Sequence, residues 1–117
     1  MTTPLTIELL YFDGCPGYEE ILLALERLTG EGDVELVKRT IDDMEEAVSA
    51  RFLGSPSVRV EGVDVEPGAS ARSDFGMKCR VYRVDGQQTN RPHLEWISLA
   101  LERALTVDPP GTVDRDD

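Results

Sequence analysis

Two cysteines, Cys15 and Cys79, are the side chains of this chain best suited to chemistry. A thiolate is a nucleophile and a ligand for soft metal ions, and two neighbouring thiols can form a disulfide. Cys15 lies in the run Tyr11-Phe12-Asp13-Gly14-Cys15-Pro16-Gly17-Tyr18, where an apolar segment gives way to helical spacing. We expect Cys15 to be the N-cap of that helix and Pro16 its first residue, because proline fits the first helical position. The unpaired N–H groups of the first turn would then favour the thiolate of Cys15.

Both cysteines also have an unreactive interpretation. Free cysteine is among the most buried residue types, so Cys15 alone is compatible with a small apolar residue of the core. Cys79 lies in the β-rich run 77–84 and is compatible with a buried strand residue. A disulfide requires Cα atoms within about 7 Å. The sequence leaves open whether the two cysteines lie close enough for a disulfide or a shared metal ion.

The elements that must position these residues follow from hydrophobic spacing and turn residues. The run 5–12 is apolar enough for a strand buried on both faces. The second strand should lie parallel to the first, because a helix connects them. We expect Thr40 or Asp42 to cap the second helix, and Thr89 or Asn90 to lie near the cap of the last. The predicted elements are strand 5–12, helix 16–29 ended by Gly30 and Gly32, strand 34–40, helix 42–53, a hairpin of strands 58–60 and 63–65 around Glu61-Gly62, an extended edge segment 77–84, a loop 85–90 and helix 92–105.

Composition limits the partners and location of the chain. Its 117 residues suffice for one domain, which we expect over 1–105, followed by an acidic, disordered tail over 106–117. The formal net charge of −11 argues against nucleic acid and an anionic membrane surface as partners. No run approaches the roughly 20 apolar residues of a membrane helix, and the N-terminus lacks the features of a signal peptide. We therefore expect a cytoplasmic protein, in which any disulfide is a working one rather than a structural one.

The predicted order of elements, β-α-β-α-β-β-α, resembles the minimal thioredoxin fold of glutaredoxins. Three motifs carry the resemblance: Cys15-Pro16-Gly17-Tyr18 between the first strand and helix, Gly54-Ser55-Pro56 before the third strand, and Val65-Glu66-Pro67-Gly68 after the hairpin. The chain is similar to small bacterial thioredoxin-family proteins of unassigned role, some of which are labelled alkylmercury-lyase-like. The resemblance covers residues 5–105, less an insertion at 69–90. It implies a thioredoxin-like α/β fold, a three-layer α/β/α sandwich with a mixed four-stranded sheet, and a cis peptide bond at Pro56.

The same resemblance implies a thiol–disulfide oxidoreductase in which Cys15 attacks a disulfide, and Cys79 or an external thiol resolves the mixed disulfide. Tyr18 replaces the second cysteine of the family motif, and Asp13 replaces a basic residue of the glutathione site. Two alternatives are open: a protein that binds a soft metal or an organomercurial through Cys15 and Cys79, and a non-catalytic interaction module. We expect no cofactor, and a thiol or disulfide partner, protein or small molecule, bound by Tyr18, Ser55, Pro56 and Arg80.

Overall fold

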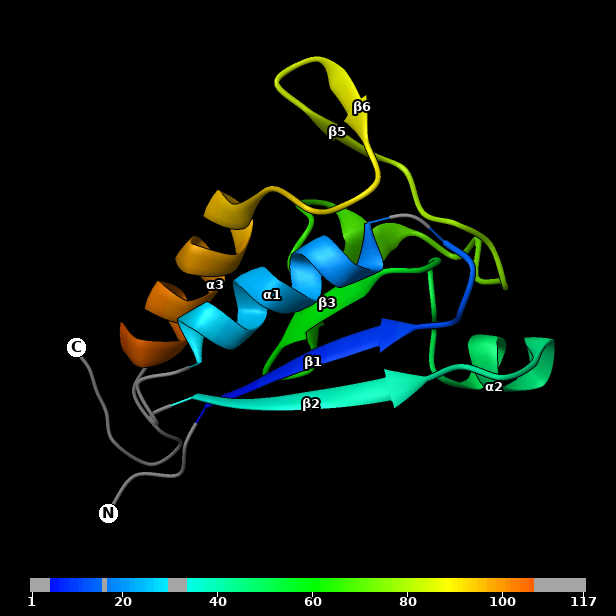
Figure 1. Cartoon of the computed structure of the whole chain (residues 1–117), viewed down its shortest axis with the longest axis horizontal. Coiled ribbons are helices and arrows are strands. Elements are labelled where there is room, and N and C mark those ends of the chain that lie inside the picture. The colour runs from blue at the N-terminus through cyan, green and yellow to red at the C-terminus, as the bar shows by residue number, and fades with distance from the viewer. Residues whose placement is uncertain (1–4, 16, 30–33, 107–117) are drawn as a thin grey trace.

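The computed structural model describes residues 5–15, 17–29 and 34–106, which form a mixed α/β fold (Figure 1). The elements are β1 (Leu5–Tyr11), α1 (Tyr18–Leu28), β2 (Val34–Thr40), α2 (Met44–Ser49), β3 (Ser57–Val60), β4 (Val63–Asp64), a 3₁₀ helix (Ala69–Ala71), β5 (Tyr82–Val84), β6 (Gln87–Thr89) and α3 (Leu94–Thr106). Four strands form one sheet in the order β2-β1-β3-β4, and β5 and β6 form a separate hairpin. Within these described ranges, no helix combines the length and the apolar character that crossing a membrane requires.

Strand β1 is central to the sheet and pairs on both sides. It runs parallel to β2 and antiparallel to β3, so that Ile7 lies opposite both Leu36 and Val60. Leu9 and Leu10 are fully buried although successive strand residues point to opposite faces, so both faces of β1 are covered. The two predicted parallel strands and the predicted β3-β4 hairpin are therefore confirmed, with small shifts at their ends.

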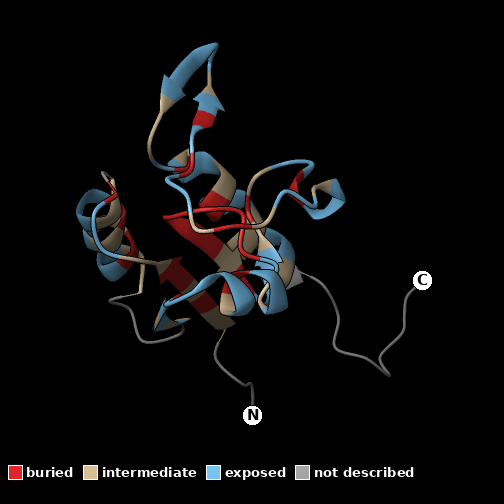
Figure 2. Cartoon of the chain, turned by 90° about the vertical axis from the view of Figure 1, so that its right-hand side faces the viewer, coloured by how far each residue is buried: buried red, intermediate tan, exposed pale blue. Residues whose placement is uncertain are grey.

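Helices α1 and α3 cover one face of the sheet and enclose the main core (Figure 1). The apolar side chains of α1 recur at helical spacing and face this core, namely Ile21, Leu22, Leu25 and Leu28. Figure 2 shows that buried residues concentrate in the central strands, whereas the β5-β6 hairpin is mostly exposed. The buried residues of the core are Ile7, Leu9, Ile21, Leu25, Val58, Val60, Val65 and Ile97.

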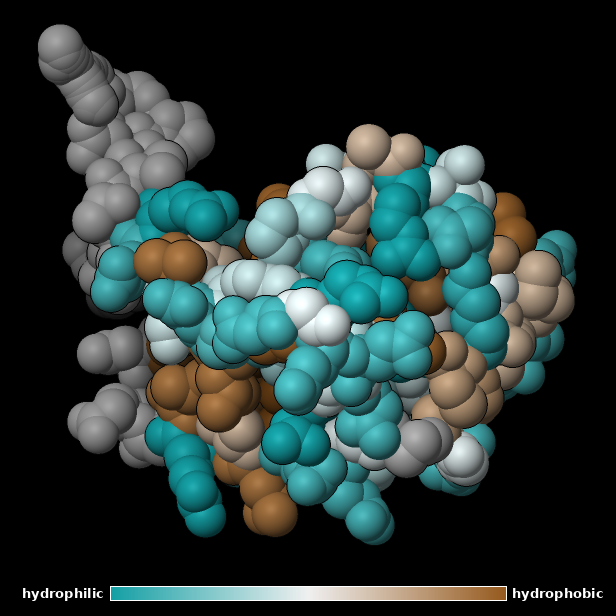
Figure 3. Space-filling model, turned by 90° about the horizontal axis from the view of Figure 1, so that it is seen from above, coloured by the Kyte–Doolittle hydropathy of each residue, from teal (hydrophilic) through white to brown (hydrophobic). Residues whose placement is uncertain are grey.

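Helix α2 packs near the end of β1 on the other face of the sheet. Leu10 of β1 meets Ala47 of α2 there, and Ile41 and Phe52 complete this smaller buried cluster. Seen from the side of the β5-β6 hairpin, the surface of the molecule is mostly hydrophilic, in keeping with the net charge of −11 (Figure 3).

The extent predicted for the second helix, 42–53, is wrong. Asp43, not Thr40 or Asp42, is the N-cap, and its side chain accepts a hydrogen bond from the Glu46 N–H. The Glu46 carboxylate accepts a hydrogen bond from the N–H of Asp42, the residue just before the cap. The helix ends early because the backbone of Arg51 takes a positive φ of 56°, which turns the chain back toward the sheet.

The insertion after β4 forms a hairpin of its own and adds no edge strand to the main sheet. Only Tyr82–Val84 of the predicted segment 77–84 is a strand, and it pairs with Gln87–Thr89, which was predicted as loop. Both turn residues, Asp85 (φ 54°) and Gly86 (φ 79°), have the positive φ that a two-residue hairpin turn requires. The prediction of an edge strand is therefore wrong, because the segment pairs locally instead.

Helix α3 begins two residues later than predicted and continues to Thr106. Thr89 ends β6, and Asn90 is separated from the helix by Arg91–His93, so neither is its cap. Both residues thus lie near the start of α3, as predicted, but not next to it, because β6 extends into the region that was assigned to a loop. The prediction of Pro16 as the first helical residue is wrong, because α1 begins at Tyr18 after the Gly17 cap. Two further predictions fall outside the described residues and stay predictions: Gly30 and Gly32 as the helix end, and the tail beyond Thr106.

The central position of β1 leads to a stability prediction. Leu9→Ala should lower the free energy of unfolding by about 2–5 kcal/mol, because it removes a fully buried side chain and leaves a cavity. The matched control Leu23→Ala, at a side chain that is 57% exposed, should change it by less than about 1 kcal/mol. Urea unfolding followed by circular dichroism measures both values, and equal losses would contradict this assignment of the core.

Candidate functional site

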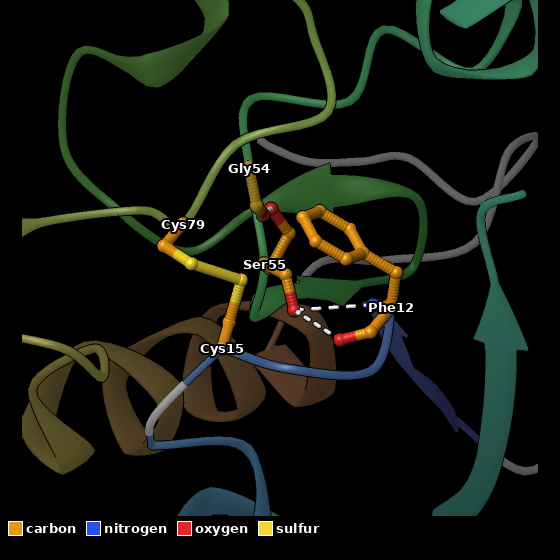
Figure 4. Close-up of a disulfide and its surroundings, with 6 residues drawn as sticks. Phe12, Cys15, Gly54, Ser55 and Cys79 are labelled. Atoms are coloured by element: carbon orange, nitrogen blue, oxygen red, sulfur yellow. Dashed lines mark hydrogen bonds between the residues drawn. A yellow bond between two sulfur atoms is a disulfide. The ribbon is translucent and has the colours of Figure 1, made fainter. Parts of the chain in front are cut away.

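Cys15 and Cys79 form a disulfide, with 5.3 Å between their Cα atoms (Figure 4). The residues are 64 positions apart in the sequence and come from the loop after β1 and from the insertion. The two cysteine residues are exposed to very different degrees. Cys15 is 8% exposed, whereas Cys79 is an exposed residue. The question that the sequence left open is thus answered, because the two cysteines are close enough to bond.

The position of Cys15 relative to α1 differs from the prediction. Gly17 is the N-cap, with a φ of 93°, and its carbonyl accepts the first helical hydrogen bond from the Ile21 N–H. Cys15 therefore lies two residues before the cap, in the loop between β1 and α1. The prediction that Cys15 itself caps the helix is wrong, because a glycine in the left-handed conformation starts α1 instead.

Ser55 connects the two halves of the site through its backbone. Its N–H donates to the carbonyl of Lys78 (2.8 Å), and its carbonyl accepts from the N–H of Arg80 (2.9 Å). Ser55 and Cys79 are thus partners in a short parallel bridge that lies beside the disulfide. The Ser55 side chain also accepts a hydrogen bond from the N–H of Phe12 and donates one to its carbonyl, as Figure 4 shows. The Ser55–Pro56 peptide bond is cis, which confirms the prediction.

Gly54 allows segment 78–80 to approach this closely. A Cβ atom at Gly54 would lie 2.9 Å from the Cβ of Arg80 and 3.0 Å from the carbonyl oxygen of Lys78. Gly54 also has a φ of 128°, which side-chain-bearing residues rarely adopt. Close approach and backbone conformation therefore both require glycine here.

Arg80, next to Cys79 in the chain, is 2% exposed and forms hydrogen bonds with buried or half-buried groups. One terminal nitrogen donates to Ser57 Oγ and to Asp64, and the other donates to Asp64 and Glu66. Its Nε has no acceptor in the part of the chain that the structure describes. Burial lowers the pKa of Arg80, but the hydrogen bond and charge of Asp64, with contributions from its other neighbours, raise it above the ordinary value. Arg80 therefore stays charged and anchors segment 78–80 to β3 and β4.

Tyr82 adds a second anchor beside Arg80. Its hydroxyl donates a hydrogen bond to the carbonyl of Pro56, and its ring lies 4.5 Å from the Arg80 guanidinium carbon. Burial raises the pKa of Tyr82 above its ordinary value, so the hydroxyl keeps the proton that it donates. The chain on both sides of Cys79 is consequently fixed to the loop that contains Ser55 and Pro56.

Tyr18 lines a hollow of about 580 Å³ beside Cys15. Its ring stacks on Tyr11, with 4.1 Å between the ring centroids. A side-chain hydrogen bond with Tyr11, partial burial and nearby carboxylates raise the pKa of Tyr18 to about 12. Tyr18 is thus a neutral hydroxyl at physiological pH and cannot act there as a base. The hollow is acidic, and its lining residues are Asp13, Gly14, Cys15, Gly17, Tyr18, Glu19 and Glu20.

The structure thus brings Ser55, Pro56 and Arg80 to the disulfide, whereas Tyr18 lies in the adjoining hollow. Sequence reasoning missed the residues that hold Arg80, which are Ser57, Asp64, Glu66 and Tyr82. Asp64 and Glu66 alternate along the chain, a pattern equally typical of a solvated strand.

Among the described residues, no group of three or more histidine, cysteine or acidic side chains is placed to hold a metal ion. No protein-family model, curated protein or solved structure matches this chain.

The anchoring of Arg80 can be tested through its carboxylate partners. Asp64→Asn should lower the free energy of unfolding by about 1.5–3 kcal/mol, because it weakens charged hydrogen bonds to a buried guanidinium. The control Asp74→Asn removes the charge of a carboxylate that pairs with Arg72 and Lys78, but that side chain is 51% exposed. It should cost less than about 1 kcal/mol. Equal losses in urea unfolding would show that Arg80 is not the anchor.

Proposed function

We propose that this protein is a thiol–disulfide oxidoreductase that uses Cys15 and Cys79 as its redox pair. The observation that carries the proposal is the 5.3 Å separation of their Cα atoms, which suits reversible disulfide formation. The exposure of Cys79 gives an external thiol or disulfide access to this pair. The partner is a thiol or disulfide compound, either a small molecule or a protein.

A thioredoxin-like fold is part of the proposal. It is supported by the sheet order β2-β1-β3-β4, with β1 parallel to β2 and antiparallel to β3, and by the two helices on one face. The cis Ser55–Pro56 bond beside the disulfide further supports it. The position of the second cysteine differs from that in the thioredoxin-family motif. Cys79 comes from the insertion and not from the helix that follows the first cysteine.

The redox couple is a two-electron one. In the oxidised protein the two sulfurs share a bond, and reduction by two external thiols yields two protein thiols and one external disulfide. The reverse reaction reduces an external disulfide and closes the Cys15–Cys79 bond. The hydrogen bonds of Ser55 and the ion pairs of Arg80 do not involve either sulfur, so they can hold Cys79 beside Cys15 in both states.

Both cysteines should be required for the full rate of turnover. The wild-type protein should accelerate the reduction of a small disulfide by dithiothreitol, and Cys15→Ser or Cys79→Ser should lower the rate, because a lone sulfur must wait for an external thiol to resolve its mixed disulfide. Ser73→Ala, at an exposed serine of the insertion, is the matched control and should keep the wild-type rate. A wild-type rate no faster than background, or full activity in either cysteine variant, would refute the proposal.

A soft-metal function is the second candidate, and the same juxtaposition of sulfurs favours it. Two thiolates suffice for the linear coordination of mercury(II) or copper(I), whereas structural zinc sites require four ligands. The reduced protein should therefore retain one Hg²⁺ per chain against a competing monothiol, and either Cys→Ser variant should lose it. Mass spectrometry under native conditions measures the retained metal. Equal retention by a single-cysteine variant would exclude a two-sulfur site.

A further inference from the structure

We propose that external thiols exchange at the sulfur of Cys79 and not at that of Cys15, so that the mixed disulfide of the reaction is carried by Cys79. This inference rests on the proposed thiol–disulfide function and assigns the order of its steps. The resemblance to thioredoxin-family proteins implied the opposite order, in which Cys15 attacks the external disulfide. The accessibility, the charge and the backbone pairing around the two sulfurs all favour Cys79.

Accessibility is the first argument. A thiolate attacks a disulfide sulfur in line with the bond that breaks, so it must approach from the side opposite the leaving sulfur. An external thiolate that attacks the sulfur of Cys15 would have to reach a residue that is only 8% exposed. An attack on Cys79 approaches a residue that is exposed, and its neighbour Lys78 is exposed as well. The open approach therefore leads to Cys79.

Charge is the second argument. The hollow that adjoins Cys15 is lined by Asp13, Glu19 and Glu20, and no lysine or arginine is among its described lining residues. Of these three carboxylates, that of Glu20 accepts a hydrogen bond from Arg91. The attacking species is a thiolate anion, and like charges repel it from this side. The carboxylates thus protect the Cys15 sulfur from external thiolates.

Backbone pairing is the third argument. The N–H and carbonyl of Ser55, which would be the groups to bind an extended partner, are already bonded to segment 78–80. Arg80 holds that segment with its side chain turned into the protein, while Cys79 is exposed. A partner therefore meets the outer side of Cys79 before it can reach Cys15. This arrangement suits a small thiol or a thiol that projects from a protein surface.

The reaction can be written with its electrons. An external thiolate forms a bond to Sγ of Cys79, the Cys15–Cys79 bond breaks, and its electron pair leaves with Sγ of Cys15, which takes a proton from water. A second external thiolate attacks the external sulfur of the mixed disulfide and releases Cys79 as a thiolate. Two external thiols are oxidised to one disulfide, and the protein disulfide is reduced by two electrons. In the reverse direction Cys79 attacks an external disulfide, and Cys15 then displaces the external thiol.

The adduct can be located directly. Oxidised wild-type protein is mixed with 2-mercaptoethanol, quenched with acid at early times and alkylated with N-ethylmaleimide. Digestion after glutamate residues separates the two cysteines for mass spectrometry. We expect mercaptoethanol on Cys79 and N-ethylmaleimide on Cys15, in excess over the opposite pattern by about tenfold or more, because access decides which sulfur is attacked.

Single-cysteine variants provide a second measurement that does not depend on trapping. Cys79 in Cys15→Ser should react with a small aromatic disulfide about tenfold or more faster than Cys15 in Cys79→Ser, because only Cys79 is exposed. Adducts mainly on Cys15, or equally on both, would overturn this assignment and leave the proposed function intact. A protein disulfide that forms no adduct at all would overturn both.

Discussion

The buried Arg80 guanidinium is the interaction on which the position of the two sulfurs depends. Taking this charge out of water costs several kcal/mol, and two carboxylates, Asp64 and Glu66, offset the cost through well-aligned hydrogen bonds. Because a guanidinium binds carboxylates in a fixed geometry, it also sets the register of segment 78–80 against Ser55. A shift of one residue in that register would turn Cys79 to the other side of the segment, away from Cys15.

The sheet was predictable because its pattern is local. The apolar run that became β1 is buried on both faces, and a helical connection made the parallel pairing with β2 the expected one. The hairpin of β3 and β4 followed from two alternating runs around a turn that contains glycine. The β5-β6 hairpin had an equally local signal in Asp85-Gly86, but the polar composition of Gln87–Thr89 concealed the second strand. The turn residues alone were enough to predict this hairpin, but the segment after the turn was interpreted as a loop.

The candidate site was only partly predictable, for a physical reason. Cys15, Ser55 and Pro56 stand next to elements that the hydrophobic pattern defines, so their approach to one sheet edge followed from the topology. The place of Cys79 depends on long-range contacts of the insertion. These contacts, between Arg80 and residues of β3 and β4, have no periodicity in the sequence. The α1 cap was misplaced although glycine is a preferred cap residue and cysteine is not, because Pro16 was assigned to the first helical position.

The network around Arg80 also bears on whether the disulfide is structural or reactive. A structural disulfide is needed where a segment has few other contacts, as in small domains with little core. Segment 78–80 has backbone hydrogen bonds to Ser55, and it has buried ion pairs that do not involve sulfur. Tyr82 holds the chain just beyond it through the carbonyl of Pro56. Because these contacts do not involve sulfur, they remain available to hold the segment when the disulfide is reduced, which supports the proposed redox role. The pairing of an exposed cysteine with a buried one, both held by the surrounding fold, likewise supports the proposal that this disulfide opens and closes.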